Sequence, residues 1–170
     1  MWKRKVIGSH LFREDIVMCE DSIFSWEVLK DAKRVCYCNL PMYHYRIRET
    51  SATRNSSINK MMGALVSYEL MLGDASMLSE SVAINLVRQY LVWNYLIFKQ
   101  LIKQKTPDYT AYERIKNNCK EKIGYLSCLG IEARVGISCI ARFGYVQAKI
   151  VVSLLDGLQG IKGKFATKNQ

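Results

Sequence analysis

Hydrophobic and polar positions follow two different patterns along the 170 residues of this chain. Near the start, Arg34–Leu40 has the composition of a β-strand and ends at Pro41, and Tyr43–Ile47 resembles a second short strand. The segment from Glu49 to Ser57 is polar and rich in Ser and Thr, which predicts a loop. From Ile58 onward, apolar residues recur at steps of three and four, as they do on one face of a helix.

Several segments carry helix signals. Asp21 or Ser22 is a suitable N-cap for a first helix, and Thr106-Pro107-Asp108 is a helix-start signal further along the chain. The predicted helices run over about 22–32, 58–72, 79–104, 107–127, 131–145 and 146–158. The basic tail Gly160–Gln170 is expected to fray.

These elements predict an α+β fold. The two strands, within residues 34–48, are expected to form a remnant of a mixed sheet that packs on the helix at 22–32. A mainly helical extension is expected to follow. We therefore expect two regions, residues 1–54 and residues 55–170.

Composition narrows the class of protein. Hydrophobic residues make up 49% of the chain, so we expect a packed core. The net charge of +10 lies mainly in the C-terminal part, since residues 1–54 carry +3, residues 55–94 carry −1, and residues 95–130 and 131–170 carry +4 each. Such an excess suits anionic lipid, a phosphate-bearing substrate, nucleic acid, or solubility alone. No nucleic-acid-binding motif accompanies the charge, so we expect no nucleic-acid partner.

The cysteines and the apolar runs indicate the cellular location that we expect for this chain. None of the six cysteines forms a C-x-x-C pair, and without a visible signal peptide they are expected to be reduced. No apolar run reaches the roughly 18 residues expected of a membrane span. We expect a cytoplasmic protein that binds peripherally to the inner face of the membrane.

The acidic pair Glu20-Asp21 stands at the head of the first predicted helix. A carboxylate at a helix N-terminus is fixed in direction by the backbone, which suits a general base. The plain alternative is that Asp21 only caps the helix.

A cluster of Tyr, His and Arg residues follows the predicted strand. It reads Tyr43-His44-Tyr45-Arg46-Ile47-Arg48, and the hydroxyl-rich run Ser51-Ala52-Thr53 comes shortly after it. The forked guanidinium groups of Arg46 and Arg48 suit a diphosphate. A solvated strand edge is the plain alternative. A histidine beside two tyrosines is either structural or a metal ligand, and both roles stay open for His44.

The order of these motifs over residues 12–54 resembles the second half of the catalytic domain of family 2 glycosyltransferases, which have the GT-A fold and use nucleotide sugars. The resemblance rests on Phe12, Glu20-Asp21, Phe24, the Tyr-x-Tyr-Arg run and the Ser-x-Thr loop. It implies an inverting transfer of a sugar to a glycan or lipid-linked acceptor, in surface polysaccharide synthesis.

The resemblance also implies roles for particular residues. Asp21 would be the catalytic base, with Glu20 in support. A substrate-binding group near the leaving nucleoside diphosphate would include Tyr45, Arg46, Arg48 and Ser51. His44 would be a ligand of the divalent metal, Mg or Mn, that the complete enzyme uses.

No Asp-x-Asp motif, which the family uses to hold the sugar nucleotide and its metal, occurs in this sequence. We therefore expect an N-terminally truncated piece that binds no metal by itself, is inactive alone and associates with another chain. The competing hypothesis is a non-catalytic helical module. In that case, the basic apolar C-terminal helices would dock on a membrane surface or a partner protein.

Overall fold

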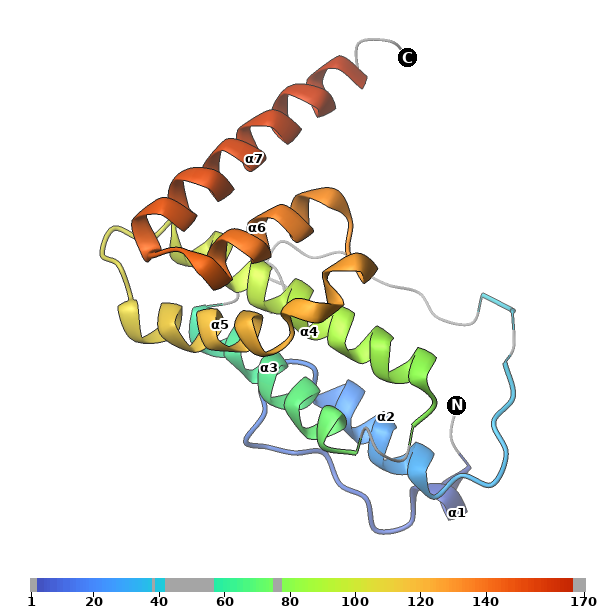
Figure 1. Cartoon of the computed structure of the whole chain (residues 1–170). Coiled ribbons are helices and arrows are strands. Elements are labelled where there is room, and N and C mark those ends of the chain that lie inside the picture. The colour runs from blue at the N-terminus through green and yellow to red at the C-terminus, as the bar shows by residue number, and fades with distance from the viewer. Residues whose placement is uncertain (1–2, 38, 42–56, 75–77, 167–170) are drawn as a thin grey trace. The chain divides into compact units, whose positions relative to one another are not determined.

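All the regular secondary structure in the described part of the chain is helical. The computed structural model describes residues 3–37, 39–41, 57–74 and 78–166, with side chains up to residue 158. These residues contain helices and no strand (Figure 1). The chain divides into two compact units, residues 1–73 and residues 74–170, and each is described by itself. The predicted α+β fold is therefore wrong.

The predicted strand at 34–40 fails for a physical reason. Its apolar side chains are not half-buried on a pleated surface, since Val35 is 65% exposed, Tyr37 89% and Leu40 67%. Strand preference expresses packing against neighbouring strands, and none of the described residues supplies a second strand. The predicted strand at 43–47 lies outside the described residues.

In its described residues, the first unit contains three helices, α1 (Arg4–Ile7), α2 (Glu20–Lys30) and α3 (Ile58–Gly73). The helix pair α2 and α3 forms its centre. Buried apolar side chains of both helices, together with Ile16 from the preceding segment, form the core: Ile16, Ile23, Val28, Met61, Ala64, Leu65 and Met71. Burial of these side chains is the main source of the unit's stability.

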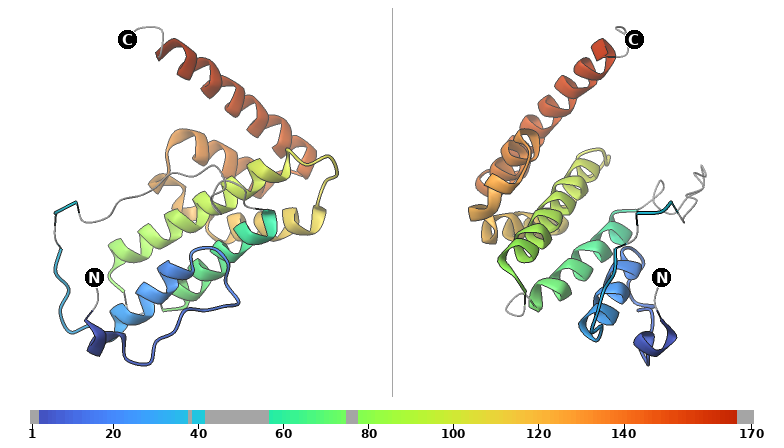
Figure 2. Two further views of the ribbon diagram at one scale, coloured as in Figure 1. Left: turned by 180° about the vertical axis from the view of Figure 1, so that it is seen from behind. Right: turned by 90° about the vertical axis from the view of Figure 1, so that its right-hand side faces the viewer.

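The second unit is a helical bundle that includes one 3₁₀ segment. Its elements are α4 (Glu80–Leu101), α5 (Tyr109–Glu121), η2 (Ile123–Cys128), α6 (Ile131–Arg142) and α7 (Tyr145–Ala166). Helix α4 contacts α5, η2 and α6, and α7 packs on α6. Figure 2 shows the same helices from two other directions.

The helix signals of the sequence succeed and fail at identifiable places. The predicted start near Pro107 is confirmed, because the Asp108 carboxylate accepts a hydrogen bond of 2.9 Å from the Ala111 N–H. The helix that was expected to reach residue 127 ends at Glu121, and η2 replaces its last turns. The expected fraying from Gly160 is wrong up to Ala166, because α7 continues to that residue.

Aromatic side chains occupy the middle of the second unit. The ring centroids of Phe98, Tyr112 and Tyr145 lie 5.4 to 6.0 Å apart, mostly in edge-to-face arrangements. The Tyr112 hydroxyl donates a hydrogen bond of 2.7 Å to the Phe143 carbonyl oxygen. This bond joins α5 to the turn between α6 and α7, so it helps to fix where α7 begins.

Candidate functional site

The acidic pair lies in the first turn of α2. Cys19 is the N-cap, and Glu20 and Asp21 are the first two helical residues, so the helix begins slightly earlier than the sequence predicts. The Asp21 side chain is exposed, and its Oδ1 accepts a hydrogen bond of 2.8 Å from the Ser22 N–H. Among the described residues, no donor contacts its Oδ2. One oxygen is thus held by the backbone while the other faces solvent.

The residue before the pair has an unusual backbone. Cys19 has φ 63° and ψ 24°, and it is the only described residue other than glycine with a positive φ. Its carbonyl oxygen accepts hydrogen bonds from the Ile23 N–H at 3.2 Å and from the Ser67 hydroxyl at 3.3 Å. Left-handed geometry is costly for a residue with a side chain, so these bonds hold the bend that leads into the acidic pair.

Two aromatic rings that flank the acidic pair in the sequence contact each other. The rings of Phe12 and Phe24 stack with centroids 4.2 Å apart and planes 8° from parallel. Ile23, beside Phe24 in the chain, is almost fully buried. Phe12 and Phe24, which carry part of the resemblance, therefore meet in space and anchor the segment before α2 on that helix.

The acidic pair affects the thiol of Cys19. Its pKa is raised to about 11, first by partial burial and then by the nearby negative charges of Asp21 and Glu20. A thiol with this pKa is protonated at neutral pH, so Cys19 is a poor nucleophile. The acidic pair thus creates a negative field at the Cys19 thiol.

The other predicted site residues cannot be placed. Five of them, His44, Tyr45, Arg46, Arg48 and Ser51, lie outside the described residues, so their positions relative to Asp21 stay predictions. Within the described residues, no three His, Cys, Asp or Glu side chains come together to hold a metal ion.

A charged cluster in the second unit was not predicted from the sequence. The Lys99 Nζ pairs with Glu132 Oε1 at 3.3 Å and with Asp156 Oδ1, and the Tyr95 hydroxyl donates to Glu132 Oε1 at 2.9 Å. Burial alone would lower the pKa of Lys99, but the two carboxylates outweigh it and raise that pKa. Because α4, α6 and α7 each contribute, the cluster is a structural tie between helices.

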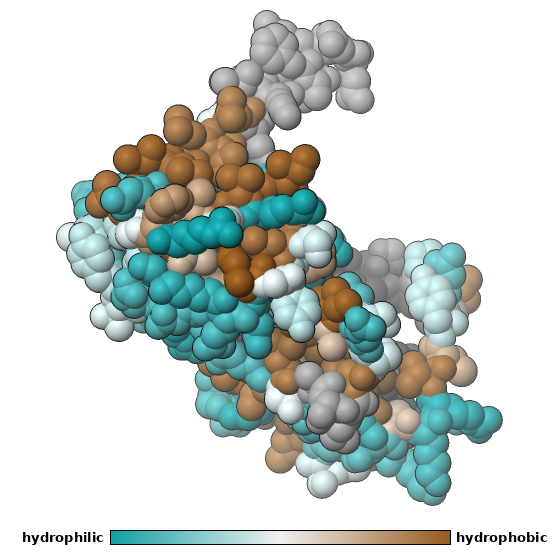
Figure 3. Space-filling model, in the orientation of Figure 1, coloured by the Kyte–Doolittle hydropathy of each residue, from teal (hydrophilic) through white to brown (hydrophobic). Residues whose placement is uncertain are grey.

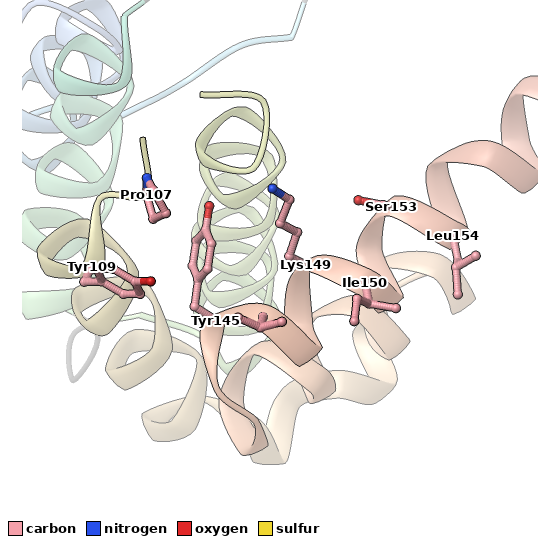
Figure 4. Close-up of a pocket in the computed structure, with 8 residues that line it drawn as sticks. Pro107, Tyr109, Tyr145, Lys149, Ile150, Ser153 and Leu154 are labelled. Atoms are coloured by element: carbon pink, nitrogen blue, oxygen red, sulfur yellow. The ribbon is translucent and has the colours of Figure 1, made fainter. Parts of the chain in front are cut away.

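An apolar groove lies beside α7. It has a volume of about 590 Å³ and is lined by residues of the turn before α5, of α5 and of α7. Figure 4 shows the side chains of Pro107, Tyr109, Tyr145, Lys149, Ile150, Ser153 and Leu154 along it. Lys149 is the one charged residue among those that line it.

Comparisons with protein-family models, curated proteins and solved structures found no match for this chain. None of the described helices combines the length and the hydropathy needed to cross a bilayer.

Proposed function

We propose that this chain takes part in an inverting glycosyl transfer from a nucleotide sugar, with Asp21 as the base. The observation that carries the proposal is the exposed Asp21 carboxylate at the start of α2, with Oδ1 held by the Ser22 N–H and no donor among the described residues on Oδ2. A base of this reaction must reach the hydroxyl of an acceptor that arrives from solution.

The chemistry assigned to Asp21 is a single proton transfer. Its carboxylate takes the proton of the acceptor hydroxyl as that oxygen attacks the anomeric carbon. The bond from the anomeric carbon to the diphosphate breaks, and the nucleoside diphosphate leaves with the electron pair. Glu20 supports the negative field. Binding of the leaving group is assigned to Tyr45, Arg46, Arg48 and Ser51 and to a donor-binding segment with which the chain works.

The test compares two carboxylates of the same unit. The protein that contains this chain is purified from the cells that naturally produce it. Sugar transfer from a panel of radiolabelled nucleotide sugars is then measured. We expect Asp21→Asn to lower kcat by about 10²- to 10⁴-fold, which is the usual contribution of a general base. Asp15→Asn is the matched control, because Asp15 is also exposed and its partner is Arg13. Full activity of Asp21→Asn, or no transfer by the unmodified protein, would refute the proposal.

The surface of α7 favours a second candidate function, docking on an anionic membrane surface. Four apolar side chains at steps of four are 56 to 64% exposed: Val146, Ile150, Leu154 and Leu158. Residues four apart lie on one side of a helix, so these form a continuous stripe. Figure 3 shows hydrophobic surface gathered over α7.

The charge around this stripe matches anionic lipid. Residues 131–170 contain six basic residues and only two acidic ones, Glu132 and Asp156. Both of these carboxylates pair with Lys99, which offsets one of their two negative charges. Lys149 is exposed beside the stripe and lines the adjoining groove. An apolar stripe with basic neighbours is typical of helices that lie in the membrane interface.

Vesicle co-sedimentation tests this second candidate. We expect the full chain to bind vesicles that contain phosphatidylglycerol and to bind neutral phosphatidylcholine vesicles weakly. Ile150→Gln with Leu154→Gln should abolish binding, whereas Val82→Gln, at an exposed apolar position of α4, should not. Equal loss in the control, or self-association through the stripe in analytical ultracentrifugation, would contradict membrane docking.

A further inference from the structure

The first unit contains a second depression, lined by basic side chains that the resemblance does not use. Its volume is about 730 Å³, within the range of small-molecule sites. Two segments far apart in the sequence form its walls, residues 3–10 and residues 31–36. The ionisable residues that line it are Lys3, Lys5, His10, Asp31, Lys33 and Arg34.

One contact holds the two walls together. The His10 Nε2 lies 2.8 Å from the Asp31 Oδ2, and the ring nitrogen donates because an ionised carboxylate only accepts. Asp31 is the C-cap of α2, and His10 follows the turn at Gly8, whose φ is 55°. A left-handed turn of this kind favours glycine, so Gly8 allows the N-terminal segment to fold back toward the end of α2.

Positive charge predominates among the residues that line the depression. Asp31 is its one acidic lining residue, and it is engaged by His10. Within the described part of the chain, Lys3, Lys5, Lys33 and Arg34 form no ion pair with a carboxylate. Among the described lining residues the four cations outnumber the one carboxylate, so the cations repel one another, and a bound anion relieves that repulsion.

We propose that this depression is a binding site for the diphosphate group of a small molecule. A single phosphate carries a charge of about −1.5 to −2 near neutral pH. Four cations less the one carboxylate of Asp31 leave an excess of three positive charges in the described lining, which is more than a single phosphate offsets. Arg34 supplies a planar fork for two phosphate oxygens, and the lysines supply flexible point charges. Among the described residues, no aromatic side chain lines the depression, and this part of the lining offers no stacking platform for a base.

The inference does not rest on the role of Asp21. Diphosphate groups occur both on nucleotides and on isoprenoid lipids, and the depression would recognise the chemistry that they share. Its remaining lining residues are small or apolar, among them Val6, Ala32 and Val35. They offer the rest of the ligand a contact surface that does not select for particular polar groups.

Isothermal titration calorimetry on the full chain tests the site with inorganic pyrophosphate as the probe. We expect saturable binding, tighter than that of orthophosphate, that weakens as salt is added. Lys33→Gln with Arg34→Gln should weaken binding at least tenfold. The control Lys60→Gln with Lys120→Gln removes the same charge from exposed positions elsewhere and should change binding less than twofold.

Two further titrations identify the source of the diphosphate and control for misfolding of the variant. A nucleoside diphosphate that binds more tightly than pyrophosphate would indicate a nucleotide, and a tighter isoprenoid diphosphate would indicate a lipid. Lys33→Arg with Arg34→Lys keeps both charges and should retain most of the binding. Absence of pyrophosphate binding by the unmodified chain, or equal loss in the control variant, would overturn the proposal.

Discussion

Gly136 of α6 lies directly against the ring of Tyr95 of α4. A Cβ atom added at Gly136 would lie 2.3 Å from Cε2 of Tyr95, closer than any real contact of that kind. The ring is not free to move aside, because it is 96% buried and its hydroxyl donates to Glu132. The absence of a side chain at Gly136 is therefore what permits α4 and α6 to approach closely.

Gly136→Ala should destabilise the protein by about 1–3 kcal/mol, the usual cost of overpacking a core. The matched control is Gly157→Ala in α7, where an added Cβ would meet no atom within 4 Å. That change should stabilise by about 0.5–1 kcal/mol, because alanine is the better helix former. Urea unfolding followed by circular dichroism measures both variants, and equal effects would show that the Tyr95 contact does not limit packing.

Tyr112→Phe should cost about 1–2 kcal/mol of stability. The change deletes the hydroxyl that donates to the Phe143 carbonyl oxygen and leaves that partly buried acceptor without its 2.7 Å partner. Tyr109→Phe is the control, because Tyr109 is 60% exposed and its hydroxyl makes no hydrogen bond with the described residues. Thermal unfolding should show a lower Tm for Tyr112→Phe alone. A similar Tm for both variants would show that the Tyr112 hydroxyl does not help to position α7.

The sequence predicts the helices well where one face is buried. On α4, Tyr90, Ile97 and Leu101 lie in the core, and the cap at Asp108 marks the start of α5. These features depend on spacing along a single segment, so the sequence contains them. The segment 34–40 is different, because a strand also needs a partner, and composition alone does not supply one.

The candidate sites also divide into features that the sequence predicts and features that it does not. Glu20 and Asp21 are adjacent in the chain, so their position at a helix start could be predicted from the sequence. The basic depression could not, because the His10–Asp31 contact joins residues 21 positions apart. The cluster around Lys99 likewise combines three helices. Clusters of this kind depend on packing that no local pattern encodes.

The ion pairs of Lys99 predict how stability changes at alkaline pH. Its pKa is raised in the folded state by Asp156 and Glu132, against the effect of burial. A raised folded pKa gives stability that is fully present below the unfolded value and is lost as pH rises through the folded value. Lys99→Met should therefore cost about 1–2 kcal/mol at pH 8, which is typical of hydrogen bonds to a charged group that is partly exposed, and the difference from the unmodified chain should shrink above pH 11.

Urea unfolding at several pH values measures this difference. Lys120→Met is the control, because Lys120 is exposed at the end of α5 and pairs with no carboxylate among the described residues. A cost at Lys99 that does not change with pH would mean that packing of the lysine stem, rather than its charge, is what stabilises the cluster.

Asp21 should control the reactivity of Cys19. The Cys19 thiol has a pKa of about 11, raised first by burial and then by Asp21 and Glu20, so at pH 9 only roughly 1% of it is thiolate. Asp21→Asn removes one of the two nearby negative charges and should lower that pKa. The rate of Cys19 alkylation by iodoacetamide between pH 8 and 10 should then rise severalfold. Mass spectrometry of the modified peptide measures this rate without reliance on enzymatic activity.

Cys36 provides the internal reference for that experiment. Its thiol is exposed and lies outside α2, so its alkylation rate should be the same in both forms of the protein. Asp15→Asn should leave Cys19 unchanged, because the Asp15 carboxylate is engaged by Arg13 and does not contribute to the shifted pKa of Cys19. If Cys19 reacts at the same rate with and without the Asp21 charge, burial alone raises its pKa. The charge of Asp21 would then have no measurable effect on the Cys19 thiol.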